Sequence, residues 1–250
     1  ARQAGFTVNP STLERGLAYA RQIVKTTSTL RGTWAFNQQA YALYVLGESG
    51  AGDRAKVIEL YEGRDNLGLY GRALLALTLG KNDPKDARLK TLFADLNRDA
   101  VLSATGAHWE EKQPDWWAFN SNTRSTALVV SALARFDPQN ALAPNAVRWL
   151  MAGRTEEGIW KSTYESAWVM ISLIDWATAT GELKANYDYS ALLNGKRLGQ
   201  GVATRETLAV TQIFTTPIAG LLRETANRLT LERSAGEGRL YYTVHLRAAL

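Results

Sequence analysis

The sequence contains no cysteine and only two histidines, and this scarcity removes several kinds of chemistry from consideration. Without cysteine the 250 residues hold no disulfide, no thiolate metal ligand and no cysteine nucleophile. No apolar run approaches the roughly 20 residues that a helix needs to cross a bilayer, so we expect no transmembrane segment. No run of Lys or Arg exceeds two residues, and the acidic residues are interspersed. We expect no nucleic-acid partner, because such proteins concentrate basic residues on one face.

The composition that remains is that of an ordinary globular protein. Hydrophobic residues make up 46% of the chain and charged residues 21%, which is enough to build a buried core. The formal net charge of +5 bears on solubility more than on fold. The sequence begins with ARQAGF rather than an initiator methionine, so we expect it to be a piece of a longer protein. No signal peptide is recognisable in it.

The composition and the hydrophobic periodicity change near residue 185. All eight tryptophans and both methionines precede this point, as do five of the six prolines. Beyond it the periodicity changes from helical to alternating. We therefore predict a mainly α fold class with a C-terminal β region, in which residues 1–184 form an α-helical domain and residues 185–250 an antiparallel β region.

Short-range signals predict the strands of the C-terminal region. Apolar and polar residues alternate from Leu229 to Leu231 and from Leu240 to Leu246, which is typical of half-buried strands. Asn194-Gly195 predicts a hairpin turn, and residues 234–238 predict a turn that joins the last two strands. So small a region with open edges has a thin core, so we predict that further strands lie upstream; a small independent sandwich is the alternative.

Capping signals mark where the helices of the first region begin. Ser11 and Ser162 each start a Ser-Thr-x-Glu capping box. In this motif the serine hydroxyl accepts a hydrogen bond from the backbone amide of the glutamate, and the glutamate side chain accepts one from the backbone amide of the serine. Asp53 precedes a helical run. Asp83-Pro84 offers a capping side chain followed by a proline at the first helical position.

Three glycines, Gly47, Gly80 and Gly181, follow apolar stretches and are predicted to end helices. Together the start and stop signals predict eight helices. They are expected near residues 11–26, 34–47, 53–62, 67–80, 85–102, 121–136, 144–153 and 163–180.

The second, fourth, sixth and eighth of these helices are rich in alanine, leucine and valine, whereas the others carry more charge. The eighth is apolar on nearly every face, which predicts that it is buried among other helices. Gly and Trp recur at Gly32–Trp34, Gly106–Trp109 and Gly158–Trp160, where we expect the glycine to turn the chain and the indole to lie between neighbouring hairpins. This degenerate repeat predicts an incomplete (α/α) toroid of helical hairpins.

Candidate catalytic or metal-binding groups are few. His108 lies near Glu110, Glu111 and Asp115, a combination that would suit a metal or an acid–base pair. No second ligand stands at helical spacing from it, so we favour a polar loop with solvated charges. We interpret His245 as a surface histidine in the middle of a strand.

Asp115-Trp116-Trp117 is similar to the acid and aromatic cradle of enzymes that handle carbocations. The aspartate-rich motif that such enzymes need is absent, as are a phosphate-binding glycine loop and a serine nucleophile elbow. Glu156-Glu157 is typical of a solvated turn. We therefore predict no catalytic, cofactor-binding or metal-binding residue and no cofactor, and we do not expect an enzyme.

Eight segments in consistent order carry a resemblance along nearly the whole chain. They read ARQAGFTVNPSTLERGLAYARQ (1–22), LGLYGRALLALTLG (67–80), GAHWEE (106–111), TRSTALVVSALARFDP (123–138), AVRWLMAGR (146–154), GIWKSTYESAWVMISLIDW (158–176), YSALLNG (189–195) and GRLYYTVHLR (238–247). With these segments the sequence resembles the bacterial alpha-2-macroglobulin-like proteins.

The resemblance implies that residues 1–184 are the C-terminal part of a thioester-type helical domain and that the β region closes a CUB-like β-sandwich. It implies an endopeptidase inhibitor that traps target proteases, is periplasmic or exported, and contacts further macroglobulin-like domains of the same chain. The family's Cys-x-Glu-Gln thioester motif is absent from these residues. No position therefore inherits a catalytic role, and the chain is expected to be a structural fragment.

Two other functions are compatible with helical hairpins. An (α/α)-toroid enzyme acting on an isoprenoid or a glycan would carry acids at the N-terminal ends of the inner helices. Those positions are instead occupied largely by Asn120, Asn122, Thr123, Ser162 and Thr163. A helical-repeat binding scaffold would expose a conspicuous apolar or charged groove.

Overall fold

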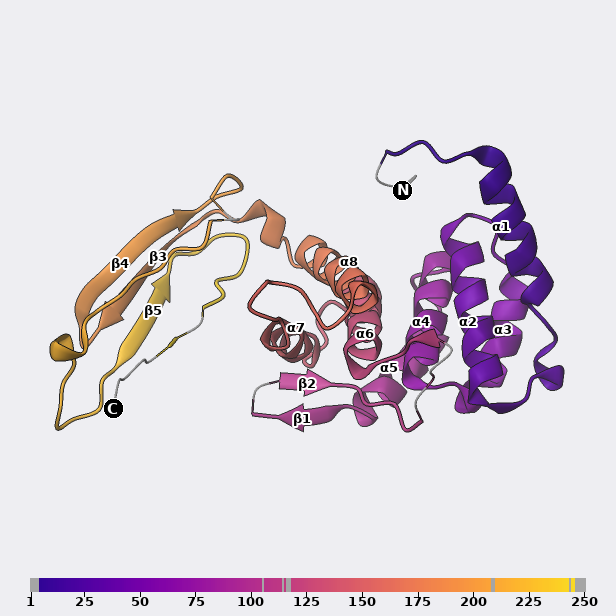
Figure 1. Cartoon of the computed structure of the whole chain (residues 1–250), viewed down its shortest axis with the longest axis horizontal. Helices are drawn as coiled ribbons and strands as arrows, with labels where there is room; N and C mark the ends of the chain where they lie inside the picture. The colour runs from indigo at the N-terminus through magenta and orange to yellow at the C-terminus, as the bar shows by residue number, and fades with distance from the viewer. Residues whose placement is uncertain are drawn as a thin grey trace. The chain divides into compact units, whose positions relative to one another are not determined.

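The computed structural model describes residues 5–104, 106–113, 115, 118–207, 210–242 and 244–245. It confirms a mainly α chain with antiparallel β structure towards the C-terminus (Figure 1). The chain separates into two compact units, a helical unit at Ala1–Trp176 and a β unit at Ala177–Leu250. The assignment of residues 1–184 and 185–250 to a thioester-type domain and a CUB-like region stays a prediction.

Eight α-helices lie in the described residues, and each corresponds to a predicted helix. Their bounds are α1 Pro10–Ile23, α2 Gly32–Glu48, α3 Arg54–Glu62, α4 Leu69–Asn82, α5 Arg88–Arg98, α6 Asn122–Phe136, α7 Ala143–Ala152 and α8 Thr163–Ala179. The inner helices pack in a row, α2 on α4 and α4 on α6, and the outer helices α1, α3, α5 and α7 pack against this row. The helical unit is thus an incomplete (α/α) toroid of hairpins, with its core along the apolar inner helices.

Glycines inside the inner helices allow close packing rather than ending the helices. The sequence predicts that Gly47 ends α2 and that Gly80 ends α4, and both predictions are wrong because α2 continues to Glu48 and α4 to Asn82. A Cβ atom on Gly80 would lie 2.5 Å from the ring of Phe136 in α6, a distance that real Cβ contacts do not reach. Only Gly181 acts as predicted, with a φ of 70° just after α8.

Two of the predicted helix starts are confirmed. The side chain of Asp53 accepts the Lys56 amide at 3.1 Å at the start of α3. The hydroxyl of Ser162 accepts the Glu165 amide at 3.1 Å at the start of α8. In both cases the capping residue and its partner lie three positions apart, so the signal is entirely local.

The other two predicted starts are wrong. Asn9, not Ser11, caps α1, because its Oδ1 accepts the Ser11 and Thr12 amides at 3.0 and 3.2 Å and Pro10 occupies the first helical position. Asp83 belongs to the turn after α4, where its Oδ1 accepts the Lys85 amide at 2.9 Å. The following helix, α5, begins only at Arg88.

A β-hairpin replaces the end of the predicted helix 85–102. α5 ends at Arg98, and β1 (Val101–Ser103) pairs antiparallel with β2 (Gly106–His108). β2 packs on α7 so closely that a Cβ atom on Gly106 would lie 2.6 Å from the Asn145 carbonyl oxygen. Contact with a distant helix, rather than local propensity, therefore decides the conformation of this segment.

Two of the three tryptophans in the Gly-Trp repeat lie between hairpins as predicted. Trp109 and Trp160 are buried, and their indole N–H groups donate to the carbonyls of Leu96 in α5 and Leu150 in α7 at 2.7 and 2.8 Å. Each indole N–H thereby donates to a carbonyl near the C-terminal end of the preceding outer helix, where carbonyls lack a partner within the helix. The prediction is wrong for Trp34, which is 49% exposed because it lies in the first turn of α2 on the outward face of that helix.

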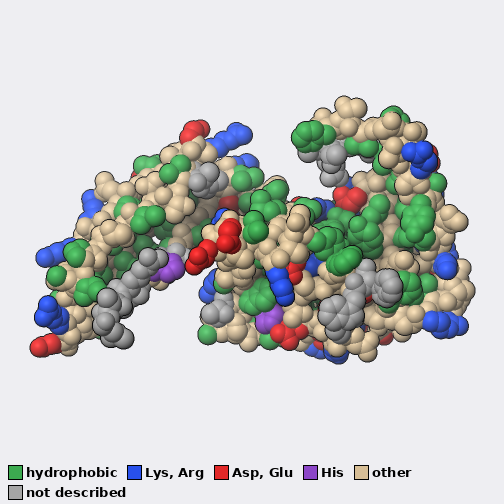
Figure 2. Space-filling view, in the orientation of Figure 1, with side chains coloured by type: hydrophobic (Ala, Val, Ile, Leu, Met, Phe, Trp, Pro, Cys, Tyr) green, Lys and Arg blue, Asp and Glu red, His purple; other side chains and the backbone are tan. Residues whose placement is uncertain are grey.

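α8 is not buried on all faces, contrary to the prediction. It buries Val169, Ser172 and Trp176. Met170 and Ile174 lie on its other side and are 53% and 58% exposed. Figure 2 shows hydrophobic side chains at the surface of the helical unit. The described helices pack against one face of α8. Its other face is also apolar, but it is exposed among the described residues.

The β unit contains a three-stranded antiparallel sheet in the order β4-β3-β5. β3 (Tyr187–Leu193) and β4 (Lys196–Ala203) form the predicted hairpin, in which Asn194 and Gly195 have positive φ angles of 53° and 78°. β5 (Leu229–Arg233) contains the strand predicted at Leu229–Leu231. The buried cluster of the described residues holds Ala185, Tyr187 and Ala203, with Tyr189 and Leu240 packed against it, so the core is as thin as the length of the region predicts.

The predicted strand from Leu240 to Leu246 does not form in residues 240–242 and 244–245, and residue 246 lies outside the described residues. Tyr241 and Tyr242 are exposed, and no described strand pairs with this segment. An alternating pattern needs a neighbouring strand to become a ladder, and this one has none among the described residues. His245 is exposed as predicted, although it does not lie in a strand.

Candidate functional site

A polar network joins the N-terminal ends of α4 and α6. The carboxylate of Glu111, in the loop after β2, accepts the amides of Leu69 and Tyr70 at 3.0 and 2.8 Å. The hydroxyl of Ser125 in α6 donates to the same carboxylate at 2.8 Å. The neighbouring Gly68 amide donates to Asn37 of α2 at 2.9 Å. Glu111 therefore caps α4 from a distant segment, where the helix dipole favours a negative charge.

Asp115 extends this network to a tyrosine. The Tyr70 hydroxyl donates to Asp115 Oδ2 at 2.5 Å, and the Ala118 amide donates to Asp115 Oδ1 at 3.2 Å. Burial and the adjacent Asp115 carboxylate raise the pKa of the Tyr70 hydroxyl well above its ordinary value. Both oxygens of Asp115 are thus acceptors in the folded chain. Trp116 and Trp117 of the predicted cradle lie outside the described residues.

Arg124 in the first turn of α6 lies under a group of aromatic rings. The residue is only 1% exposed. One guanidinium nitrogen donates to Asn120 Oδ1 at 3.0 Å. The guanidinium carbon lies 4.5 Å from the ring centroid of Tyr70, 5.2 Å from that of Tyr164 and 5.7 Å from that of Trp168. These distances are within the range of cation–π interactions.

A second network joins the C-terminal parts of the inner helices. Arg135 of α6 lies 2.9 Å from Asp175 of α8 and 3.4 Å from Glu48 of α2, and the hydroxyl of Ser131 also donates to Asp175. The Tyr44 ring of α2 also packs against the Trp168 ring of α8, with centroids 6.2 Å apart. The charged groups are partly exposed, so each pair contributes only about 0–1 kcal/mol, and the network fixes which helices are neighbours more than it stabilises them.

Tyr44 makes stability fall at alkaline pH. Burial, followed by the charge of Glu48, raises the pKa of Tyr44 to about 12, whereas an unfolded tyrosine ionises near pH 10. The unfolded chain therefore loses this proton first, and the stabilising difference present below about pH 10 disappears as the pH rises towards about 12. We expect Tyr44→Phe to flatten the fall in urea midpoint over that range. A fall equally steep in the variant would contradict the assignment.

Of the three acids near His108 in the sequence, Glu110 is the one that pairs with it. It lies in β2 rather than in the expected loop, and its ring stacks on Trp149 with centroids 4.5 Å apart. Its Nε2 lies 2.8 Å from the carboxylate of Glu110, whereas Glu111 and Asp115 take part in the network at α4. In the described part of the chain no group of three or more His, Cys, Asp or Glu side chains could hold a metal ion.

Two polar residues at the start of α6 serve the same network. Asn122 accepts the Glu111 amide at 3.3 Å, and Asn120 lies between Arg124 and the Ser125 hydroxyl. Glu156-Glu157 lies in an exposed turn, as predicted. Sequence reasoning missed the roles of Glu111 and Arg124. The one available signal is an arginine followed by Ser and Thr at the start of an otherwise apolar inner helix.

The fold that carries this network is a row of αα-hairpins, and a separate antiparallel sheet follows it in sequence. No helix in residues 5–104, 106–113, 115, 118–207, 210–242 and 244–245 is long and apolar enough to span a membrane. No family model matches the sequence, and no curated protein matches it either.

Solved structures with this fold include bacterial alpha-2-macroglobulins. The Salmonella protein reacted with methylamine matches with a TM-score of 0.55 and 20% identity, over 84% of this chain and 14% of that one. A native Escherichia coli structure from domain MG7 to the C-terminus matches with a TM-score of 0.54 and 16% identity, over 81% of this chain and 30% of that one. The Escherichia coli protein activated by porcine elastase matches with a TM-score of 0.54 and 16% identity, over 83% of this chain and 18% of that one.

The predicted resemblance to bacterial alpha-2-macroglobulins is therefore confirmed at the level of the fold. The chain covers 14% to 30% of the length of these three proteins. The TM-scores of 0.54 and 0.55 establish the shared fold, and at identities of 16% to 20% the likeness does not extend to activity.

Proposed function

We propose that this chain is a non-catalytic, structural part of a protease-trapping endopeptidase inhibitor of the alpha-2-macroglobulin type. The observation that carries the proposal is the shared fold over more than four-fifths of the chain, together with the ordered sequence segments that resemble the same family. One of the matching structures is described as activated by porcine elastase, which links that protein to a protease.

In this proposal residues 1–184 belong to a thioester-type helical domain and residues 185–250 to a CUB-like sheet. The partners are target proteases, bound through the full-length protein, and further macroglobulin-like domains of the same polypeptide. The location is the periplasm or the cell exterior. Because these 250 residues hold no cysteine, they cannot form an internal thioester by themselves. Their contribution is a rigid frame whose inner helices are tied together by the Glu111 and Arg135 networks.

The alternative of a toroid enzyme requires free acids at the N-terminal ends of the inner helices. Glu111 and Asp115 do lie there, but both are already acceptors of hydrogen bonds from backbone amides and hydroxyls. A carboxylate that caps a helix is poorly placed to protonate a substrate, since doing so would release the amides that it holds. The geometry therefore favours a structural role for both acids.

The proposal is tested with porcine elastase, the protease named for one of the matching structures. The full-length protein that contains this chain is incubated with active elastase, and elastase with a blocked active site serves as the control. We expect cleavage of the full-length protein, a change in its mobility on native gels and retention of elastase only in the active arm. The 250-residue chain alone should leave elastase activity unchanged. Degradation of the full-length protein without retention of elastase would refute the proposal.

A further inference from the structure

Arg124 is a buried cation that has no anionic partner in the described chain. The residue is 1% exposed, its Nε has no hydrogen-bond partner, and the hydrogen bond that its guanidinium makes reaches the neutral side chain of Asn120. No carboxylate of the described residues forms an ion pair with it within 4.0 Å. The residues outside the described set include no aspartate or glutamate. Among the described residues, the guanidinium is stabilised by the Asn120 hydrogen bond and by the faces of three aromatic rings, none of which carries a counter-charge.

Other arginines of the helical unit show that this arrangement is unusual. Arg72 and Arg135 are less completely buried, and each pairs with a carboxylate, Arg72 with Asp99 at 3.0 Å and Arg135 with Asp175 at 2.9 Å. Burying a guanidinium without a counter-charge is unfavourable, and aromatic faces replace only part of its hydration. The most deeply buried arginine is thus the one for which the described chain supplies no carboxylate partner.

Glu165 does not fill this role. It follows Tyr164 in α8 and is 7% exposed, but it makes no ion pair with Arg124. Asp115 is directed towards the Tyr70 hydroxyl and the Ala118 amide. The nearest acids at this end of the bundle are therefore either engaged elsewhere or outside ion-pair distance.

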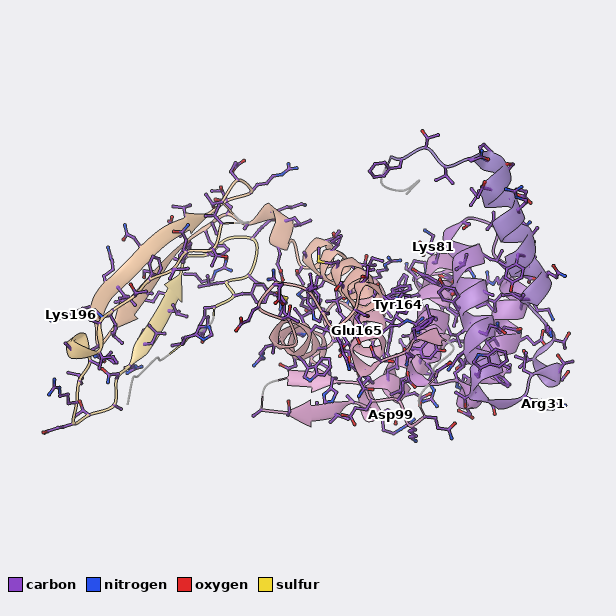
Figure 3. The ribbon with its side chains drawn as sticks, in the orientation of Figure 1. Arg31, Lys81, Asp99, Tyr164, Glu165 and Lys196 are labelled. Carbon is purple, nitrogen blue, oxygen red and sulfur yellow. The ribbon has the colours of Figure 1, made fainter. Side chains whose placement is uncertain are left out.

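Two partly exposed tyrosines, Tyr41 of α2 and Tyr164 of α8, interact with Arg124. Tyr41 of α2 is 41% exposed. Burial and then Tyr164 raise the pKa of its hydroxyl, and the charge of Arg124 acts in the opposite direction. Tyr164, labelled in Figure 3, is half-buried. Its ring centroid lies 5.2 Å from the guanidinium carbon of Arg124. A rotation of the Tyr164 side chain would open a path to the free Nε, with two tyrosine hydroxyls at its entrance.

We propose that Arg124 is a receptor for a carboxylate that enters between Tyr41 and Tyr164. The guanidinium provides the fork of N–H donors that matches a carboxylate, and the tyrosine hydroxyls provide further donors. The aromatic walls favour a carboxylate attached to an apolar body. Such a group could come from a small organic acid or from an aspartate or glutamate of another polypeptide segment, and the two sources share the same chemistry at Arg124.

The first arm of the test uses the 250-residue chain and two small probes, acetate and benzoate. Melting temperatures are measured at constant ionic strength with chloride as the reference anion. If the source is a small acid, the wild-type melting temperature rises with probe concentration to a plateau, and more with benzoate than with acetate. The rise is lost in Arg124→Met, is reduced in Arg124→Lys, and is retained in Arg148→Met, which alters an exposed arginine of α7. If Arg124→Met does not fold, the comparison rests on Arg124→Lys.

The second arm uses the full-length protein that contains this chain. If the carboxylate comes from another segment, the full-length protein does not respond to acetate or benzoate, and Arg124→Lys lowers its melting temperature more than that of the 250-residue chain. The proposal is overturned if the chain responds equally with and without Arg124. It is also overturned if the chain does not respond and the substitution shifts both proteins to the same extent.

Discussion

Replacing Trp109 with alanine lowers the free energy of unfolding of the helical unit by about 4 kcal/mol, within the range for removing a buried tryptophan. The side chain is fully buried in the main core cluster. Its indole N–H donates to the Leu96 carbonyl at 2.7 Å, and its backbone amide donates to Thr126 Oγ1 at 3.1 Å. The loss therefore combines a large cavity with a buried carbonyl that has lost its donor.

Trp34→Ala is the matched control for this substitution. Trp34 occupies the corresponding place in the repeat but is 49% exposed, so its removal should cost less than about 1 kcal/mol. Urea unfolding followed by circular dichroism at 222 nm measures both variants. Trp109→Phe should fall between them, because it keeps much of the ring but leaves the Leu96 carbonyl without its donor. Equal losses for Trp109→Ala and Trp34→Ala would show that the indole does not lie between hairpins.

Replacing Glu111 with alanine destabilises the helical unit by about 3 kcal/mol, because it removes a charged acceptor that serves several buried donors. The amides of Leu69 and Tyr70 lose their partner at the start of α4, and so does the hydroxyl of Ser125. Hydrogen exchange at the two amides should accelerate most, since the first turn of α4 then has no cap.

The neighbouring Glu110→Ala is the control for Glu111. The Glu110 side chain is 54% exposed and pairs with His108, so its loss should change stability by less than about 0.5 kcal/mol. Glu111→Gln keeps one acceptor oxygen and should lose less than Glu111→Ala. If Glu110→Ala and Glu111→Ala gave equal urea midpoints, Glu111 would not be the cap of α4.

The helices and the first hairpin of the sheet could be predicted because their signals are local. A capping side chain such as Asp53 or Ser162 contacts an amide three residues away, and both predictions are confirmed. Asn194-Gly195 requires only its own positive φ angles to form the turn between β3 and β4. Apolar periodicity distinguished inner from outer helices, because each helix must bury the face that it makes hydrophobic.

The candidate site was largely hidden from such reasoning. Glu111 caps α4 from 42 residues away, and nothing in the residues around it marks it as a cap. Nothing in the sequence around Arg124 distinguishes it from a surface arginine, because the rings of Tyr70, Tyr164 and Trp168 are brought to it by two other helices, α4 and α8. The alternating residues from Leu240 predicted a strand, yet no described strand pairs with them.

The sequence alone determined that this protein is a set of amphipathic and apolar helices followed by β structure, because each element depends on neighbours within a few positions. Only the tertiary structure decided that Gly80 serves packing rather than helix termination, since the Phe136 ring occupies the space of a side chain there. It also decided that Val101–Ser103 is a strand and that Glu111 and Arg124 share one network. These outcomes depend on contacts between distant residues, whose energies exceed the local preferences of the segments involved.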